Sequence, residues 1–501
     1  MHVGCGFGRS RPRQPSDSIL VSLSKTDAVV VGGGPNGLAA AIELAQSGHS
    51  VRVLEALDSV GGGCRSGELT EAGVVHDLCS AIYPLGRSSP FFAGLGLERH
   101  GLEWIEPPIQ LAHPLDDGRV ALVYRDIDAT AASLDDRHDA AVYARWMRPL
   151  TDDWQLIVRE LLGPLPLGAI QHPVALGRFG IPALLPVSGV ARRFRSPVAR
   201  ALFAGCGAHS FLPLQSPMTS GLAMAFLVSA HAVGWPIPRG GAGRIVDALV
   251  AVLHDAGGFI ETGHPVRSLE ELPAHGVALF DLTPRQVLTV AGGRLRGTYA
   301  AQLRRYRYGP AAFKLDFLLD GPVPWRESAV GRAGTVHLGG TIDEISASEK
   351  AVHDGTVHAR PFVLLAQPTQ FDTSRAPAGR HVVWAYCHVP NGWMGDATDS
   401  IIRQIERFAP GFQDRIIQTH VIGPAELEAN NANYIGGDIN GGLQHWAQFF
   451  TRPALRWDPY STPDPKIFIC SASTPPGGGV HGLCGMFAAR SAMRRLLATR
   501  G

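Results

Sequence analysis

The chain has 501 residues, 45% of them hydrophobic, and a formal net charge of only +1. This length leaves room for two or three domain-sized units, and the near-neutral charge argues against a protein that binds nucleic acid. The seven cysteines are scattered without the spacing of a metal site or a disulfide framework, which favours a reducing, cytoplasmic location and no bound metal.

The first 55 residues are predicted to form a tail and then a nucleotide-binding unit. Residues 1–24 are rich in Arg, Ser and Pro and lack the apolar core of a secretory signal, so we expect a disordered tail. A β-branched run at Asp27–Val31 then precedes a glycine turn, a helix that stops at Gly48, and a second strand that ends at Glu55. This order of elements is typical of a Rossmann-type fold.

The glycines of that turn have the spacing G-x-G-x-x-G of a dinucleotide site. Gly32 permits the tight turn, Gly34 lets a pyrophosphate approach the backbone, and Gly37 lets helix and strand pack closely. The helix N-terminus offers free N–H groups to phosphate, and Glu55 lies where a carboxylate binds ribose hydroxyls. The residues expected to bind the dinucleotide here are Gly32, Gly34, Pro35, Asn36, Gly37, Glu55 and Ala56.

A second glycine cluster follows the second strand at once. Gly62, Gly63 and Arg65 come within ten residues of Glu55. This arrangement resembles the second signature of flavoproteins of the phytoene desaturase and amine oxidase superfamily. The resemblance implies that the loop continues the hold on the diphosphate of FAD.

The far end of the chain supplies a second half of the same site. Residues 466–470 predict a strand, and a glycine turn that opens a helix follows it. The segment resembles the last FAD-binding segment of the phytoene desaturase-like family, which implies that Gly478, Gly479 and Val480 pass beside the flavin ring. The two ends of the chain are therefore expected to meet on one flavin.

Residues 238–268 predict a glycine turn, an amphipathic helix and a strand. No apolar strand precedes the glycines of this turn, at 240, 241 and 243, so we expect no second nucleotide fingerprint and no separate NAD(P)H domain. In the family that the chain resembles, this unit brings Val266 against the adenine side of FAD. The FAD-binding domain is thus predicted to be discontinuous, with segments 25–95, 236–290 and 456–501.

The remaining segments, 96–235 and 291–455, are predicted to build a substrate domain. Helix is expected over 136–162, and Ala311–Leu319 alternates apolar and polar side chains as a strand does. Residues 361–366 and 381–388 read as further strands, which makes an antiparallel sheet plausible. The predicted fold class is α/β, a Rossmann-type FAD-binding domain with a mixed α+β substrate domain.

Further motifs extend the resemblance over nearly the whole chain. They are HDLCSA from His76, NYIGGDINGG from Asn433, and the terminal PGGGVHG. With these, the chain is similar to the phytoene dehydrogenase-like FAD-dependent oxidoreductases, in the branch that includes pyridine nucleotide-disulphide oxidoreductase domain-containing protein 2.

Three residues are candidates for chemistry beside the flavin. His481 follows the C-terminal turn and His76 follows the glycine loop, so either could act as a general base, although each could equally be a histidine bonded to backbone. Lys314 matches a lysine of the substrate domain that contacts flavin N5 through water in amine oxidases. The alternative for Lys314 is a lysine on the solvent face of a sheet.

A long segment, Leu161–Val246, contains no acidic residue. Such a surface suits an apolar, anionic partner, so peripheral contact with an anionic membrane is one hypothesis. The alternative is an apolar core whose arginines lie at the surface. The arginines concerned are Arg178, Arg192, Arg193, Arg195, Arg200, Arg239 and Arg244.

Three functions remain open at this point. The first is an FAD-dependent oxidoreductase that desaturates or isomerises an apolar, lipid-like or polyene substrate by hydride transfer to flavin N5. The second is a flavin amine oxidase, and the third is a flavin-binding protein that serves assembly or partner binding without turnover. Oxygen, a quinone or a carrier protein is the expected electron acceptor.

Overall fold

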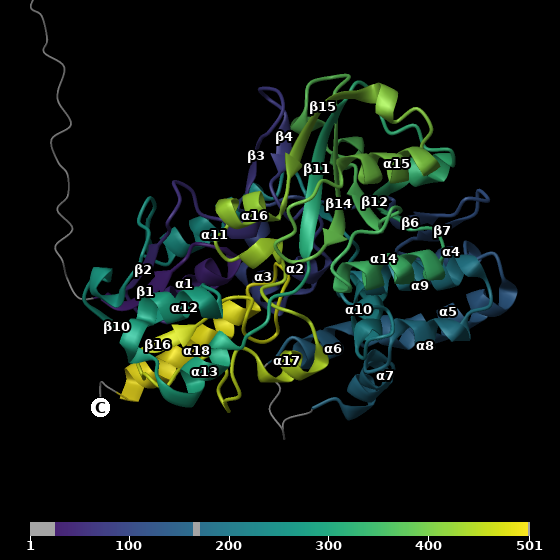
Figure 1. Cartoon of the computed structure of the whole chain (residues 1–501). Coiled ribbons are helices and arrows are strands. Elements are labelled where there is room, and N and C mark those ends of the chain that lie inside the picture. The colour runs from purple at the N-terminus through teal and green to yellow at the C-terminus, as the bar shows by residue number, and fades with distance from the viewer. Residues whose placement is uncertain (1–25, 164–170, 499–501) are drawn as a thin grey trace, which may run out of the picture.

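The structure is a computed structural model that describes residues 26–163 and 171–498. The tail predicted at residues 1–24 lies outside the described residues. Two large β-sheets occupy separate halves of the molecule, and helices pack against each of them (Figure 1).

The first sheet is parallel and has the order β16-β10-β1-β2-β9. Its strands are short and almost wholly apolar, as expected for parallel strands that are buried on both faces. They come from three segments far apart in the sequence, and the last of them brings the C-terminal end of the chain to the sheet. The strands are β1 (Thr26–Val31), β2 (Val51–Leu54), β9 (Phe259–Glu261), β10 (His275–Phe280) and β16 (Ile467–Ile469).

Helices cover both faces of this sheet. On one face, α1 (Pro35–Gln46), α11 (Gly243–Asp255) and α18 (Leu483–Ala498) share one core with β1 and β2. On the other, α12 (Pro284–Ala291) and α13 (Gly297–Arg304) pack on β10, so packing on this sheet extends past the predicted boundary at residue 290.

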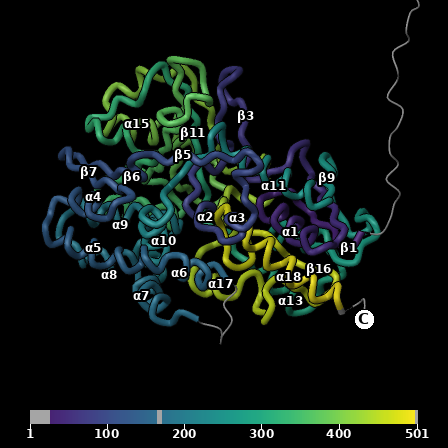
Figure 2. The backbone as a smooth tube through the Cα atoms, turned by 180° about the vertical axis from the view of Figure 1, so that it is seen from behind, coloured from purple at the N-terminus to yellow at the C-terminus, as the bar shows by residue number. Residues whose placement is uncertain are grey.

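The two ends of the chain pack against each other, as predicted. A Cβ added at Gly485 of α18 would lie 1.9 Å from the carbonyl oxygen of Asn36 in α1. Only glycine allows so close an approach of two helices, and α1 and α18 lie side by side in both overall views (Figures 1 and 2).

The second sheet has the order β15-β11-β14-β13-β12-β6-β7 and is antiparallel except for the pair β6 and β12. In β11, Phe313, Leu315 and Phe317 enter one core, whereas Lys314 and Asp316 point to the opposite face and are also buried. The sheet is therefore covered on both faces. Its strands are β6 (Ile109–Pro114), β7 (Val120–Val123), β11 (Ala311–Leu319), β12 (Ala333–Leu338), β13 (Val363–Ala366), β14 (His381–Val389) and β15 (Ile416–Ile422).

A helical layer covers one face of this second sheet. The helix predicted over 136–162 is two helices, which meet at Asp153. The fold class predicted from the sequence, a Rossmann-type sheet domain beside a mixed α+β domain, is confirmed. The helices of the layer are α4 (Ile127–Ala132), α5 (Arg137–Asp152), α6 (Trp154–Leu161), α7 (Pro173–Ala183), α8 (Val187–Val190), α9 (Pro197–Ala208), α10 (Thr219–Ala232) and α14 (Ile342–His353).

Helix α15 (Thr398–Phe408) packs on the other face of the second sheet. The remaining elements are short. They are β3 (Ser66–Glu68), β4 (Val75–Asp77), α2 (Pro84–Ser88), α3 (Pro90–Leu95), β5 (Trp104–Ile105), β8 (Ile237–Pro238), α16 (Pro424–Asn430) and α17 (Trp446–Thr451). Within the described ranges no single helix has the length and hydropathy to cross a membrane. One pair of helices, Pro173–Ala183 and Val187–Arg193, would do so only together, and it is bent by 98°.

Candidate flavin site

The turn before α1 has the geometry of a phosphate cradle. Gly32 has a φ of +101°, and a Cβ at Gly37 would lie 1.9 Å from Gly32 O, so neither position accepts a side chain. The N–H groups of Gly34 and Asn36 have no hydrogen-bond partner in the described part of the chain, and neither has the buried Asn36 Oδ1. Free donors at a helix N-terminus fit the diphosphate of a dinucleotide.

Glu55 is fixed at the carboxyl end of β2, beside this cradle. Its Oε2 accepts a hydrogen bond from Gly33 N at 2.7 Å, and its Oε1 accepts one from Leu57 N at 3.0 Å. The exposed Ala56 follows it. Val266 lies half-buried in the core that includes Leu54, next to the same strand end.

Asp281 was not among the predicted site residues, although it directly follows β10. Its Oδ2 accepts a hydrogen bond from Gly37 N at 2.9 Å, and a Cβ at Gly34 would lie 2.7 Å from that oxygen. Burial raises the pKa of Asp281 to about 7, and the nearby Glu55 carboxylate adds to the rise. Its position in the sequence, directly after a predicted strand, could have identified it, because ligands bind at the carboxyl ends of parallel strands.

The second glycine loop is closed by a segment from the far half of the chain. Tyr434 Oη would lie 2.0 Å from a Cβ at Gly63, so this position must be glycine. Arg65 donates from Nε to Gly62 O at 3.0 Å, and its Nη2 donates to Asn430 O. The NYIGGDINGG motif, which begins at Asn433, thus lies against the loop that was predicted to hold FAD.

The C-terminal turn packs against the same motif. Gly477 and Gly479 have φ values of +112° and +120°, and a Cβ at Gly478 would lie 2.9 Å from Asn440 O. Val480 packs on the core that includes α1. The structure therefore brings the N-terminal glycine turn, the second glycine loop and the C-terminal turn to one region.

Lys314, Asp316 and His76 form one buried polar network. The Lys314 ammonium donates to Asp316 Oδ2, and His76 Nδ1 lies 3.5 Å from Asp316 Oδ1. His76 Nε2 pairs with Thr70 Oγ1 at 2.9 Å. Lys314 is only 2% exposed, so its interpretation as a lysine on the solvent face of a sheet is wrong.

This network adjoins the second glycine loop through Cys79. The charge of Lys314 and a hydrogen bond from Tyr434 lower the pKa of the Cys79 thiol, although burial outweighs both and raises it. Tyr434 in turn covers Gly63. Lys314 thus lies at the junction of the two halves, and Asp316, which the sequence analysis missed, fixes its position.

His481 is buried at the end of the C-terminal turn. Its Nδ1 accepts a hydrogen bond from Leu483 N at 3.1 Å, and its Nε2 has no partner among the described residues. Burial lowers its pKa to about 4, so the ring is neutral at pH 7 and carries its proton on Nε2. In this arrangement the ring offers a hydrogen-bond donor, whereas the predicted general base needs a lone pair.

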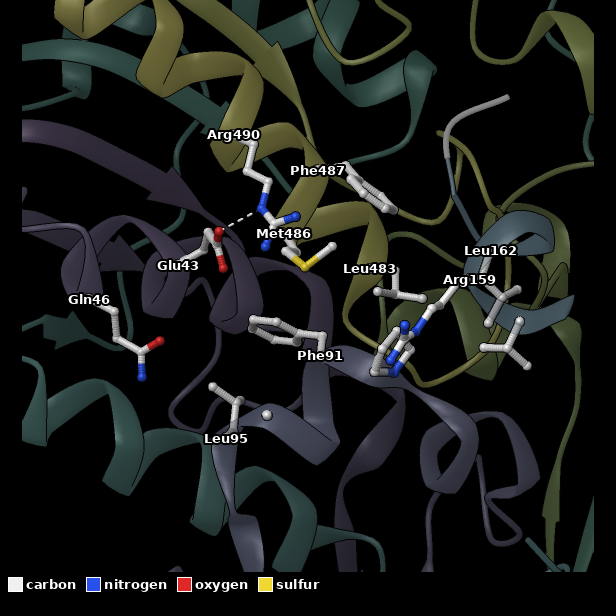
Figure 3. A pocket seen from close by; sticks show the side chains of 13 residues that line it. Glu43, Gln46, Phe91, Leu95, Arg159, Leu162, Leu483, Met486, Phe487 and Arg490 are labelled. Carbon is white, nitrogen blue, oxygen red and sulfur yellow. Dashed lines mark hydrogen bonds and ion pairs between the residues drawn. The ribbon is translucent and has the colours of Figure 1, made fainter. Parts of the chain in front are cut away.

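A cleft of about 350 Å³ opens where α1, α3, α6 and α18 meet (Figure 3). Three charged side chains line it: Glu43 and Arg490, paired at 2.7 Å, and Arg159, which has no ion pair within the described ranges. Leu483, in its wall, is two residues from His481, so the cleft reaches the end of the C-terminal turn. Its apolar walls include Phe91, Leu95, Val158, Leu162, Leu483 and Met486.

Known proteins match this chain in both sequence and fold. Residues 30–94 match the NAD(P)-binding Rossmann-like domain family. Pyridine nucleotide-disulfide oxidoreductase domain-containing protein 2 of Rattus norvegicus is 24% identical over 94% of both chains. Phytoene dehydrogenase of Streptomyces griseus is 26% identical over 82% of this chain and 80% of its own. Over most of its length the chain is therefore similar to oxidoreductases of the phytoene dehydrogenase type.

A solved structure agrees with this assignment at the level of the fold. Cyclohexylamine oxidase from Brevibacterium oxydans superimposes with a TM-score of 0.57 over 95% of this chain and 100% of its own, at 15% identity. The glycine turn at α1, with its two N–H groups that lack a partner among the described residues, suits the diphosphate of FAD.

Proposed function

We propose that this flavoprotein desaturates an apolar, lipid-like or polyene substrate, with transfer of a hydride to FAD, or isomerises it without net oxidation, with Lys314 as the catalytic residue of the substrate domain. When bound, FAD supplies a hydride acceptor at N5, which oxygen, a quinone or a carrier protein reoxidises. The observation that carries the proposal is the buried network of Lys314, Asp316 and His76 at the junction of the two halves.

The residues of this network have distinct roles in the proposal. Lys314 holds a positive charge in a site that excludes water, where it stabilises negative charge far better than in solvent. Asp316 keeps that amine charged and in place. His76, between Thr70 and Asp316, orients the carboxylate, so we infer that it is a positioning residue and not the general base.

The proposed FAD contacts follow the glycine turns. The Gly34 and Asn36 N–H groups would bind the diphosphate, and Glu55 the ribose. We propose that Gly62, Gly63 and Arg65 continue this hold, and that Val266 lies at the adenine. Gly478, Gly479 and Val480, with the Nε2–H donor of His481, would face the flavin ring.

The charges of the cleft favour an uncharged or anionic substrate. Its lining contains two arginines and one glutamate, and the glutamate is already paired with Arg490. Arg159 therefore gives the lining of the cleft a net positive charge, which repels a protonated amine and attracts a carboxylate or phosphate. The apolar wall suits a hydrocarbon chain.

Amine oxidation is the second candidate. It rests on Lys314, which the resemblance to amine oxidases singled out and which the structure buries beside the second glycine loop. The fold of cyclohexylamine oxidase is consistent with it. The positive lining of the cleft counts against it.

Anaerobic bleaching of the flavin separates the candidates. The purified holoprotein is mixed without oxygen with a panel of polyenes, fatty acids and primary amines, and absorbance near ~450 nm is followed, where oxidised flavin absorbs. Bleaching by a polyene or fatty acid supports the first candidate. Bleaching by amines, with peroxide formed when air is admitted, supports amine oxidation and excludes the first candidate. If no compound bleaches the flavin, the protein binds flavin without turnover.

A variant sharpens this test. Gly94→Trp places a bulky side chain in the cleft, where a Cβ added at Gly94 meets no heavy atom within 4 Å, and it leaves the network around Lys314 untouched. If the cleft admits the substrate, kcat/KM for the bleaching compound falls at least about tenfold, because a bulky side chain excludes the apolar chain. Unchanged flavin content shows that the fold is intact, and unchanged kcat/KM would exclude the cleft as the entry.

A further inference from the structure

The exposed side of α7 and the turn after it form an apolar surface, which we call the α7 face. Its members are Val174, Ile181, Leu184 and Leu185, with exposed fractions of 65%, 72%, 54% and 43%. The opposite side of the same helix, with Phe179 and Ala175, is buried in the core of the helical layer. The helix is therefore apolar on both sides, although a surface helix ordinarily has one polar side.

The seven arginines of the acid-free segment fall into two groups. Four of them are engaged inside this chain: Arg178 pairs with Asp153, Arg239 with Glu103 and Arg244 with Asp247, and Arg200 donates to a backbone carbonyl. For these four the interpretation as ordinary surface arginines is adequate.

The other three are Arg192 and Arg193, in the short helix η3 (Ala191–Arg193), and Arg195, two residues after it; we call them the η3 arginines. All are exposed, and in the described part of the chain none has an acidic side chain as partner for its guanidinium. Arg193 lies over the ring of Trp146 at 5.4 Å. The buried carboxylate of Asp139 accepts from the backbone N–H groups of residues 195 and 196 and lies 3.1 Å from His138 Nδ1, and none of the three guanidinium groups bonds to it. The charge of the η3 arginines is thus directed to solvent.

The α7 face and the η3 arginines are adjacent in the chain. Only Pro186, the short helix α8 and Ala191 separate Leu185 from Arg192 in the sequence. Large apolar side chains near cations that lack acidic partners among the described residues match the two layers of an anionic bilayer, hydrocarbon and headgroup.

We propose that this surface docks on an anionic lipid bilayer, with the α7 face among the acyl chains and the η3 arginines at the phosphates. Helix α6, which contributes Arg159 and Leu162 to the cleft of Figure 3, packs directly against α7. Docking in this manner places the cleft near the membrane surface. The proposal does not depend on which reaction the protein catalyses.

Vesicle co-sedimentation tests the proposal. The holoprotein is spun with vesicles of phosphatidylcholine alone or of phosphatidylcholine and phosphatidylglycerol in equal parts. We expect binding to the anionic vesicles only, and its loss at about 1 M salt, where charges are screened beyond about 3 Å. Equal binding to both vesicles, or binding to neither, would overturn the proposal.

Two sets of variants locate the surface. Replacement of the three η3 arginines by Gln lowers vesicle affinity by roughly fivefold for each charge removed, and the double variant Ile181→Glu, Leu184→Glu abolishes binding. The matched controls are Arg332→Gln, which is exposed and has no ion pair among the described residues, and Met394→Glu at a side chain that is 83% exposed. Both controls must bind like the wild type.

Flavin absorbance and the monomer peak in gel filtration report whether each variant has folded. If the η3 variant and the controls lose affinity equally, the binding is unspecific and the proposal fails. If the α7 face instead mediates a dimer that Ile181→Glu dissociates, without any affinity for vesicles, the occupant is a second copy of the chain and the lipid proposal is excluded.

Discussion

Two glycine turns in this protein open helices of similar length, yet they differ in what their backbone N–H groups do. In the turn before α11, Gly240 N donates to Asp372, Ala242 N to Asp77 and Gly243 N to Ser66. Gly241 N donates to a backbone carbonyl. In the turn before α1, the N–H groups of Gly34 and Asn36 have no partner in the described ranges.

The difference distinguishes a structural turn from a ligand cradle. Buried backbone donors are almost always paired, so unpaired ones at a helix N-terminus indicate a partner that binds there. The α11 turn is also fixed from the other half of the molecule, because the buried Arg375 pairs with both Asp77 and Asp372. The spacing of the glycines does not show which turn binds a ligand, whereas the hydrogen-bond partners of the backbone N–H groups do.

The largest effect is expected from a substitution in the α1 turn. In Gly34→Ala, the added Cβ lies 2.7 Å from Asp281 Oδ2 and occupies the approach to the free N–H groups. We expect the purified protein to lose FAD, with at least about 100-fold weaker uptake by the apoprotein, measured by quenching of flavin fluorescence.

The matched control is Gly243→Ala in the α11 turn. There the added Cβ makes ordinary contacts, the nearest at 3.6 Å with Ser66 Oγ. FAD content should match the wild type. Equal loss of FAD from both variants would mean that the two turns do not differ in function.

The second prediction compares two buried ion-pair clusters. In the Arg375 cluster, both carboxylates also accept from backbone N–H and serine hydroxyl groups. By contrast, His76 Nδ1 and Asp316 Oδ1, beside Lys314, have no hydrogen-bond partner among the described residues. We expect Lys314→Met to lower the rate of flavin reduction by about 100-fold or more, as removal of a catalytic group does. Stopped-flow bleaching measures it.

The control keeps the charge at this position. Lys314→Arg retains the cation and the pair with Asp316, so partial recovery of the rate is expected. If Lys314→Met binds FAD and is reduced as fast as the wild type, the lysine has no catalytic role.

The fold was largely predictable from the sequence because its strands carry strong local signals. The strand at Ala311–Leu319 has the bounds that its alternating pattern predicted. Strand β13 begins two residues after its predicted start, and β14 ends one residue beyond its predicted end. The burial of Lys314 was not predictable, because alternation shows which side chains share a face but not what covers that face. The β3–β4 hairpin, which carries His76, comes from the other half of the molecule.

The candidate site was predictable only where its residues are local in sequence. The α1 turn with Glu55 reads as one motif, and the structure assembles it as such. Asp281 and Tyr434 reach the site from residues more than 200 positions away, so no spacing rule connects them with Gly37 or Gly63. Contacts of this kind depend on tertiary packing.

The third prediction concerns a substitution that disrupts the α11 turn and leaves the α1 turn unchanged. Arg375→Met leaves the buried carboxylates of Asp77 and Asp372 without their cation, which costs about 3–5 kcal/mol in the free energy of unfolding. Urea unfolding should show this loss, whereas FAD affinity of the folded variant stays within about twofold. A parallel loss of FAD affinity would show that the two turns are coupled.

The last effect concerns Asp281, whose Oδ2 accepts a hydrogen bond from Gly37 N in the α1 turn at 2.9 Å. Its pKa rises from 3.8 to about 7 in the folded protein, so the folded state holds a proton that the unfolded state loses between these values. This carboxyl therefore lowers the free energy of unfolding as pH rises from about 4 to about 7, by up to about 1.4 kcal/mol per pH unit.

The variant Asp281→Asn removes this pH dependence. We expect the apoprotein of the variant to melt at a higher temperature than the wild-type apoprotein, by a margin that grows from about pH 4 to about pH 7 and stays constant above it. Because FAD brings further negative charge to the turn, its affinity for the wild type should also fall over this window more than its affinity for the variant. A difference in melting temperature that does not change with pH would show that Asp281 is ionised throughout, and the α1 turn would then have to bind a diphosphate against a fixed negative charge.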